Sequence, residues 1–207
     1  MSTTESYSKY NNLDSITTFQ ILNIINSEDK TVPYVIEKSL DKIEELIDQV
    51  YKKMEKGGRL FYIGSGTPGR LGIVDASECP PTYGVDNNVI IGIIAGGDKA
   101  IRNSVEKAED DTSQAWKDLQ GHQIDSNDSV IGISASGKTP YVVGGLRDCK
   151  DNNILTGLLT CNANTKASNF SDVIVETIVG AEVVTGSTRM KSGTAQKLIL
   201  NMISTTL

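Results

Sequence analysis

The sequence contains few of the residues that support metal, disulfide or histidine chemistry. Its 207 residues include one histidine, His122, and three widely spaced cysteines, Cys79, Cys149 and Cys161. One histidine without a close cysteine pair provides no ligand set for zinc or iron, and three distant cysteines do not make a disulfide framework. We therefore expect no metal site, a reducing cytosolic compartment, and catalysis that uses carboxylates rather than a histidine-based triad.

The chain also lacks long apolar stretches and an excess of basic residues. No segment approaches the roughly 20 apolar residues of a membrane span, and the polar first ten residues contain no signal-peptide core. The net charge is −6, whereas binding to a nucleic-acid backbone needs a basic face. We expect neither a membrane nor a nucleic acid as partner. A small anion held by backbone N–H groups remains compatible with this charge, because such binding is local.

Apolar periodicity predicts helices in the first quarter of the chain. The first dozen residues are polar, and we expect them to be frayed. A short run predicts a helix over residues 16–25. Apolar residues at steps of three and four from Ile36 to Met54 predict a second helix, with Pro33 near its start and Gly57 after its end. We expect residues 1–56 to form an N-terminal helical segment that packs on a domain formed by residues 57–207.

Five short apolar runs then alternate with helical stretches. The expected strands cover residues 60–63, 89–95, 130–134, 154–160 and 173–178. The expected helices cover 68–77, 98–119 with a break near Asp111, 140–150, and a last helix from about Ser192; a short turn is expected at 165–170. Apolar strands alternating with helices are typical of a parallel sheet covered on both faces. The expected fold class is α/β, with a doubly wound sheet of five parallel strands flanked by helices.

The chain ends at Leu207 within an apolar helix and without a Gly or Pro stop signal. This pattern predicts that the natural protein continues and that a C-terminal part is missing from the sequence.

Two small, hydroxyl-rich loops follow the first and third expected strands. Ligands of open α/β sheets bind beyond the carboxyl ends of the strands. Glycine lets the backbone approach an anion, and a helix N-terminus offers free N–H groups. Each loop leads into a helix, so we expect the pair to enclose one phosphorylated sugar. The candidate binding residues are Gly64, Ser65, Gly66 and Thr67 in the first loop and Ser134, Ser136, Gly137 and Thr139 in the second.

Both loops also match nucleotide-binding patterns, and a plain tight turn is a further alternative for the first. Gly64, Gly66 and Gly69 fit G-x-G-x-x-G, but the next expected strand ends in two glycines rather than in the acid that a dinucleotide needs. The segment 132–139 fits G-x-x-x-x-G-K-[ST], but Gly132 falls inside an expected strand and no later strand ends in an aspartate for magnesium. Both departures favour a sugar phosphate over a nucleotide.

Two glutamates and a third loop complete the candidate site. Glu78 is expected at the end of the helix opened by the first loop, where the helix dipole disfavours an acid and two prolines stop the helix. Glu109 lies in an acidic cluster. By sequence alone, each glutamate also fits a solvated part of a helix. The loop before the last helix offers Ser187, Thr188 and Lys191 as anion contacts, with a plain capped helix start as the alternative.

Several ordered motifs resemble the N-acetylmuramic acid 6-phosphate etherase family. They are Asp-Ala-Ser-Glu-Cys-Pro-Pro around Glu78, Ala-Glu-Asp-Asp around Glu109, and the segments 94–97, 135–142 and 185–197. The similarity runs from about Asp14 to Leu207. It implies a sugar isomerase (SIS) domain, a five-stranded parallel sheet flanked by helices, and a more distant similarity to the glucokinase regulatory protein.

The resemblance implies a lyase that cleaves the D-lactyl ether of N-acetylmuramic acid 6-phosphate to N-acetylglucosamine 6-phosphate and D-lactate, in the recycling of cell-wall (peptidoglycan) amino sugars in the bacterial cytoplasm. It implies Glu78 and Glu109 as the catalytic residues and the absence of any metal or organic cofactor. It also implies a homodimer with its sites near the subunit interface.

The first loop departs from the family at Pro68, where a serine is usual, and Lys138 stands where arginine is common. Pro68 removes a hydroxyl and an N–H donor from the expected phosphate site. A non-catalytic regulator that binds sugar phosphates is therefore an alternative function. An aldose–ketose isomerase, which would release no lactate, is a third.

Overall fold

Five parallel strands form one sheet in the order β2-β1-β3-β4-β5 in the computed structural model, which describes residues 3–207. The strands are β1 (Leu60–Gly64), β2 (Ile90–Ile94), β3 (Ser129–Ile133), β4 (Leu155–Thr160) and β5 (Val173–Glu176). The expected α/β class and all five strands are confirmed. The strand order reverses between β1 and β3, which is the point where open α/β sheets bind ligands.

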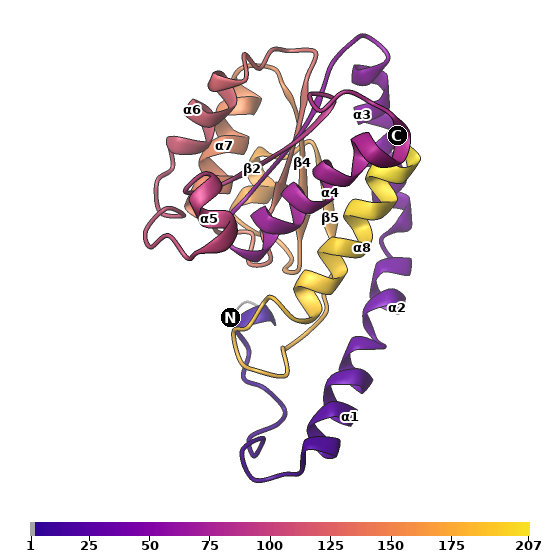
Figure 1. Cartoon of the computed structure of the whole chain (residues 1–207), viewed down its shortest axis with the longest axis vertical. Coiled ribbons are helices and arrows are strands. Elements are labelled where there is room, and N and C mark those ends of the chain that lie inside the picture. Colours follow the sequence, from indigo (N-terminus) through magenta and orange to yellow (C-terminus); the bar gives the residue numbers. More distant parts are fainter. Residues whose placement is uncertain (1–2) are drawn as a thin grey trace.

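Helices cover both faces of the sheet (Figure 1). Ile36, Leu46, Tyr62 and Ile199 belong to one buried cluster, and Phe61, Ile63, Leu119 and Leu146 to the other. The helices are α1 (Thr18–Asp29), α2 (Val32–Glu37), α3 (Leu40–Met54), α4 (Thr67–Tyr83), α5 (Asp98–Arg102), α6 (Gln114–Gly121), α7 (Pro140–Asp151) and α8 (Lys191–Thr206), with 3₁₀ turns η1 (Thr3–Glu5) and η2 (Ala167–Phe170). None of these helices combines the length and apolarity needed to cross a membrane, in the part of the chain that the structure describes.

Successive residues of β1 point to opposite clusters, which explains why the strand is apolar throughout. Tyr62 belongs to the cluster beneath α3, α4 and α8, whereas Phe61 and Ile63 belong to the cluster beneath α6 and α7. All five residues of β1 are buried. The site loops therefore start from a rigid, fully covered strand.

The N-terminal helices differ from the prediction in one respect. The helix expected up to Met54 is divided into α2 and α3 by a turn at Lys38 and Ser39. The Ser39 hydroxyl donates a hydrogen bond to the carbonyl oxygen of Glu176 at 2.8 Å, so the turn is held against β5. Figure 1 shows α1 extending from the body as an arm, whereas α2 packs against α8 and α3 packs on the sheet.

The prediction that the first dozen residues are frayed is wrong for residues 3–10; Met1 and Ser2 lie outside the described residues. The Thr4 side chain is fully buried, and the Thr3 hydroxyl donates to Asn162 Oδ1 at 2.7 Å. Further along, the Ser8 hydroxyl donates to the carbonyl oxygen of Val183 at 2.6 Å. The prediction failed because it treated polar residues as solvated, whereas these hydroxyls form hydrogen bonds with distant loops.

The region between β2 and β3 is not one helix with a single break. α5 ends at Arg102, α6 begins at Gln114, and Glu109 lies on the long loop between them rather than on a helix. The carbonyl oxygen of Glu109 accepts a hydrogen bond from the Tyr141 N–H at 2.9 Å. This tertiary bond to the start of α7 replaces helical hydrogen bonding at Glu109.

The helix after the first loop is longer than predicted. α4 passes through Pro80 and Pro81 and ends at Tyr83, where Gly84 adopts a left-handed conformation with φ of 70°. Each proline removes one helical N–H donor. Asp75 and Cys79 of α4 are buried, and the helix packs against β2 and α8. We infer that this packing outweighs the two lost hydrogen bonds.

Candidate active site

A cavity of about 420 Å³ opens at the carboxyl ends of β1 and β3, at the point where the strand order reverses. Its lining joins the two hydroxyl-rich loops to parts of the chain that are remote in sequence. The lining residues are Ser65, Gly66, Thr67 and Pro68 of the first loop, Ala135, Ser136, Lys138, Thr139 and Pro140 of the second, and Glu5, Glu109 and Thr188.

The first loop turns sharply from β1 into α4. Gly66 precedes the helix with a φ of 59°, a conformation that favours glycine. Thr67 is the first helical residue and Pro68 the second, so Gly66 and not Thr67 occupies the cap position. No side chain caps α4. Its first turn is therefore open to an anion, although Pro68 contributes no N–H group.

Hydrogen bonds to the Ser134 side chain hold the second loop in its conformation. The Ser134 and Thr139 hydroxyls are hydrogen-bonded at 2.9 Å, and the Gly137 N–H donates to Ser134 Oγ at 3.1 Å. Ser134 and Gly137 are buried and do not line the cavity. Ser136, Lys138 and Thr139 of this loop line the cavity, so one side of the loop is buried and supports it and the other side faces the cavity.

Glu109 lies against the first loop. The Ser65 hydroxyl donates a hydrogen bond to Glu109 Oε2 at 3.2 Å, and the Glu109 carboxylate is exposed at the cavity. The main-chain bond from Tyr141 to Glu109 fixes the loop that carries it. The structure therefore brings Glu109 into one cavity with Ser65, Thr67 and Ser136.

The loop before α8 contributes less than the sequence suggested. The buried carboxylate of Glu182 accepts hydrogen bonds from the N–H groups of Lys191 at 2.8 Å and Ser192 at 2.9 Å, and from the Ser192 hydroxyl at 2.8 Å. The start of α8 is therefore capped from within the protein. Of the three predicted anion contacts in this loop, Thr188 lines the cavity, whereas Ser187 and Lys191 do not.

Lys191 is buried and bound to the N-terminal arm. Its ammonium group pairs with Glu28 Oε2 at 2.5 Å, and the Tyr10 hydroxyl donates to Glu28 Oε1 at 2.9 Å. Burial alone would raise the pKa of Glu28, but the hydrogen bonds from Lys191 and Tyr10 lower it overall. Sequence reasoning missed Glu28 and Glu182, because neither lies in a motif and both act on residues far along the chain.

Glu78 lies away from the cavity within one chain. At a rise of about 1.5 Å per residue, the span from Thr67 to Glu78 covers roughly 16 Å of helix axis. The exposed Glu78 lines a separate groove of about 300 Å³ between α4 and α8, with Asp75, Lys197 and Ser204. Within one chain, Glu78 and Glu109 therefore line different cavities.

Residues 3–207 contain neither a metal-binding cluster nor an exposed cysteine thiol. Within residues 3–207, no three His, Cys, Asp or Glu side chains are grouped closely enough to hold a metal ion. The three cysteines are free and buried. Burial raises the pKa of Cys149 to about 12 and that of Cys161 to about 11, which keeps both thiols protonated and weakly nucleophilic at neutral pH.

Solved structures with the same architecture include enzymes and a sugar-phosphate complex. A phosphoheptose isomerase from Francisella tularensis has a TM-score of 0.70 and 14% identity, over 92% of this chain and 97% of that one. The Vibrio vulnificus NanR protein complexed with ManNAc-6P has a TM-score of 0.59 and 14% identity, over 91% of this chain and 64% of that one. At these identities the likeness establishes the fold alone.

The two family models that match this chain both describe SIS domains. Residues 42–150 match the glucokinase regulatory protein N-terminal SIS domain, and residues 108–205 match the SIS domain. Two proteins named N-acetylmuramic acid 6-phosphate etherase, from Christiangramia forsetii and Bacteroides thetaiotaomicron, are each 54% identical over 99% of this chain and 74% of their own length. With this identity over nearly its whole length, the chain belongs to the N-acetylmuramic acid 6-phosphate etherase family.

Proposed function

We propose that this protein is a lyase that cleaves the D-lactyl ether of N-acetylmuramic acid 6-phosphate and releases N-acetylglucosamine 6-phosphate and D-lactate. One observation supports this function most directly. In a chain of the etherase family, the cavity at the end of β1 and β3 joins two hydroxyl-rich loops to the carboxylate of Glu109.

The two loops supply the groups that a phosphate needs. Ser65, Thr67, Ser136 and Thr139 offer hydroxyls, and Lys138 offers a positive charge in the same cavity. The uncapped start of α4 adds the positive end of a helix dipole. A phosphate held there fixes the position of the sugar, which places its reacting carbons at a constant distance from the catalytic groups.

Cleavage of the ether needs two proton transfers. A base removes the proton from carbon 2, and an acid protonates the ether oxygen as D-lactate leaves from carbon 3. Water then adds to carbon 3 of the unsaturated intermediate. Two carboxyl groups with different pKa values perform such paired steps. We assign one step to Glu109, which faces the cavity, and the other to Glu78.

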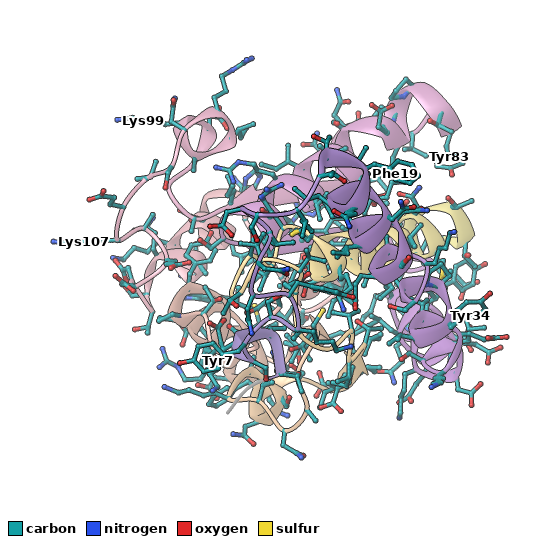
Figure 2. The ribbon with its side chains drawn as sticks, turned by 90° about the horizontal axis from the view of Figure 1, so that it is seen from below. Tyr7, Phe19, Tyr34, Tyr83, Lys99 and Lys107 are labelled. Carbon is teal, nitrogen blue, oxygen red and sulfur yellow. The ribbon has the colours of Figure 1, made fainter. Side chains whose placement is uncertain are left out.

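We infer that Glu78 reaches this cavity from a neighbouring subunit of a homodimer. Val74 lies one helical turn from Glu78 and is 55% exposed, so an apolar residue adjoins Glu78 on the surface of α4. Figure 2 shows Phe19, Tyr34 and Tyr83 at the surface, and they are 74%, 69% and 48% exposed. Exposed large apolar side chains are typical of contact surfaces, and a twofold dimer would cover them on both subunits.

We further propose a cytoplasmic location and a division of the chain into an N-terminal helical segment, residues 1–56, and a SIS domain, residues 57–207. Three free and buried cysteines support a reducing compartment. The arm formed by α1 supports a separate N-terminal segment, which packs on the domain through α2, α3 and the pair between Glu28 and Lys191.

The first experiment measures D-lactate released from N-acetylmuramic acid 6-phosphate by the purified protein. We expect Glu78→Gln and Glu109→Gln each to lower kcat by about 10²–10⁴-fold, because each removes one proton-transfer group. Binding of N-acetylglucosamine 6-phosphate should be retained. Glu37→Gln, at an exposed position on α2, is the matched control and should leave turnover unchanged.

A sugar-phosphate-binding regulator is the second candidate, and Pro68 in the cavity lining is the observation that favours it. Binding of N-acetylglucosamine 6-phosphate by the wild-type protein without any release of lactate would overturn the lyase and support the regulator. Interconversion of an aldose and a ketose phosphate without lactate would instead support an isomerase.

A further inference from the structure

The N-terminal segment, residues 3–8, lies against the loops that form the cavity. Asn162, which follows β4 and is 3% exposed, binds this segment through both ends of its amide. Its Oδ1 accepts from the Thr3 hydroxyl at 2.7 Å and the Thr4 N–H at 3.3 Å. Its Nδ2 donates to the Thr4 hydroxyl at 2.8 Å and to the carbonyl oxygen of Ala135 at 2.8 Å. One buried side chain thus joins the segment directly to the second loop.

A second anchor joins the segment to the loop before α8. The Ser8 N–H donates to the Thr185 hydroxyl at 2.9 Å, and the Ser8 hydroxyl donates to the Val183 carbonyl oxygen at 2.6 Å. Figure 1 shows the start of the described chain, after the grey trace, beside this loop. Residues between the two anchors are therefore held in place over one side of the cavity.

Glu5 lies between these anchors and lines the cavity. Its Oε2 lies close to Gly186, such that a Cβ atom on that glycine would be 3.7 Å away. The Glu5 carboxylate makes no hydrogen bond or ion pair with any other residue in the range 3–207. The segment thus presents an acceptor group to the cavity that the protein itself does not use.

The charge of Glu5 determines which part of a ligand it suits. A phosphate or the carboxylate of the lactyl group would be repelled by it. Sugar hydroxyls and an acetamido N–H are uncharged donors, and an ionised carboxylate accepts short, charge-assisted hydrogen bonds from such groups. Lys138 and the loop hydroxyls line the same cavity and suit the phosphate. The side of the cavity formed by Lys138 and the loop hydroxyls therefore suits the phosphate, and the side formed by Glu5 suits the sugar.

We propose that Glu5 is a specificity-determining residue that accepts a hydrogen bond from a hydroxyl or amide N–H of the bound amino sugar. The N-terminal segment then recognises the sugar, while the loops after β1 and β3 bind its phosphate. This inference rests on the proposed function of the cavity and adds a residue outside the motifs on which the family resemblance rests.

The test is calorimetric titration of wild-type protein, Glu5→Ala and Glu5→Gln with N-acetylglucosamine 6-phosphate and, separately, with inorganic phosphate. Loss of one charge-assisted hydrogen bond should weaken sugar-phosphate binding about tenfold or more in Glu5→Ala, with a smaller effect in Glu5→Gln. The Kd for inorganic phosphate should not increase. Glu37→Ala, at an exposed glutamate outside the cavity, should change neither Kd.

The outcomes separate this inference from the function on which it rests. Unchanged sugar-phosphate binding in Glu5→Ala, or an equal loss for both ligands, would overturn the role of Glu5 alone. A wild-type protein that binds inorganic phosphate but no sugar phosphate would overturn the proposed function and the role of Glu5 with it.

Discussion

At the scale of single residues, Asp128 joins the amino ends of two central strands, on the opposite edge of the sheet from the cavity. Its Oδ1 accepts hydrogen bonds from the Arg59 N–H at 2.8 Å and from Arg59 Nε at 3.1 Å, and its Oδ2 accepts from Arg59 Nη2 at 2.7 Å. Asp128 is 2% exposed. Burial opposes its ionisation, but the bonds from Arg59 and from the Asp125 N–H lower the pKa of Asp128 overall.

We expect Asp128→Asn to reduce the free energy of unfolding at pH 7 by about 2–4 kcal/mol, because it leaves Arg59 without its ionic partner. Since the folded-state pKa is lowered, this stabilisation is complete above the unfolded pKa of about 3.9 and is lost as the pH falls through the folded pKa. Urea unfolding of both proteins from pH 7 downward measures the difference. Asp48→Asn, at an exposed position on α3, should have little effect, and a difference that grew on acidification would contradict the prediction.

At the scale of elements, we expect the start of α4 to limit phosphate binding. Pro68 occupies the second helical position and lines the cavity, so the first turn lacks one N–H donor that an anion could use. The first N–H groups of α8 are already bound by Glu182, so that helix does not replace the missing donor. Under the proposed function, we expect the phosphate to depend on the loop hydroxyls, on Lys138 and on the remaining N–H groups of α4.

We expect Pro68→Ser to tighten phosphate binding about three- to tenfold, because it adds one N–H and one hydroxyl at the end of the helix dipole. Titration with inorganic phosphate and with N-acetylglucosamine 6-phosphate measures the change. Pro33→Ser provides a matched control, since Pro33 also occupies the second position of a helix, α2, but lies outside the cavity. An equal improvement in both variants would contradict the explanation.

At the scale of the whole molecule, the distance between Glu78 and the cavity predicts sites shared between subunits. If each site takes Glu109 from one subunit and Glu78 from the other, a dimer formed from Glu78→Gln and Glu109→Gln chains contains one intact site. Random exchange of equal amounts should then restore about a quarter of wild-type lactate release from two inactive proteins. Mixing after mild dissociation and re-association measures this recovery. Sites confined to one subunit would leave the mixture inactive.

The sequence alone determined the fold class, the five strands and the two loops of the cavity. These features depend on local patterns: apolar runs buried on both faces form the strands, and glycine with hydroxyl residues forms the loops after β1 and β3. Local patterns also indicated Ser65, Thr67, Ser136 and Thr139 as candidate site residues, and the family resemblance indicated Glu109; the structure brings these five residues into one cavity.

The tertiary structure alone decided which groups complete the cavity and which are withdrawn from it. Asn162 orders Thr3 and Thr4 and so places Glu5 in the lining, Glu28 withdraws Lys191, and Glu182 caps α8. Packing against β2 and α8 allows α4 to continue through Pro80 and Pro81, and Glu78 on this helix lines a separate groove. The physical reason is that a hydrogen bond or ion pair depends on distance in space, and many of these partners are separated by more than a hundred residues of chain.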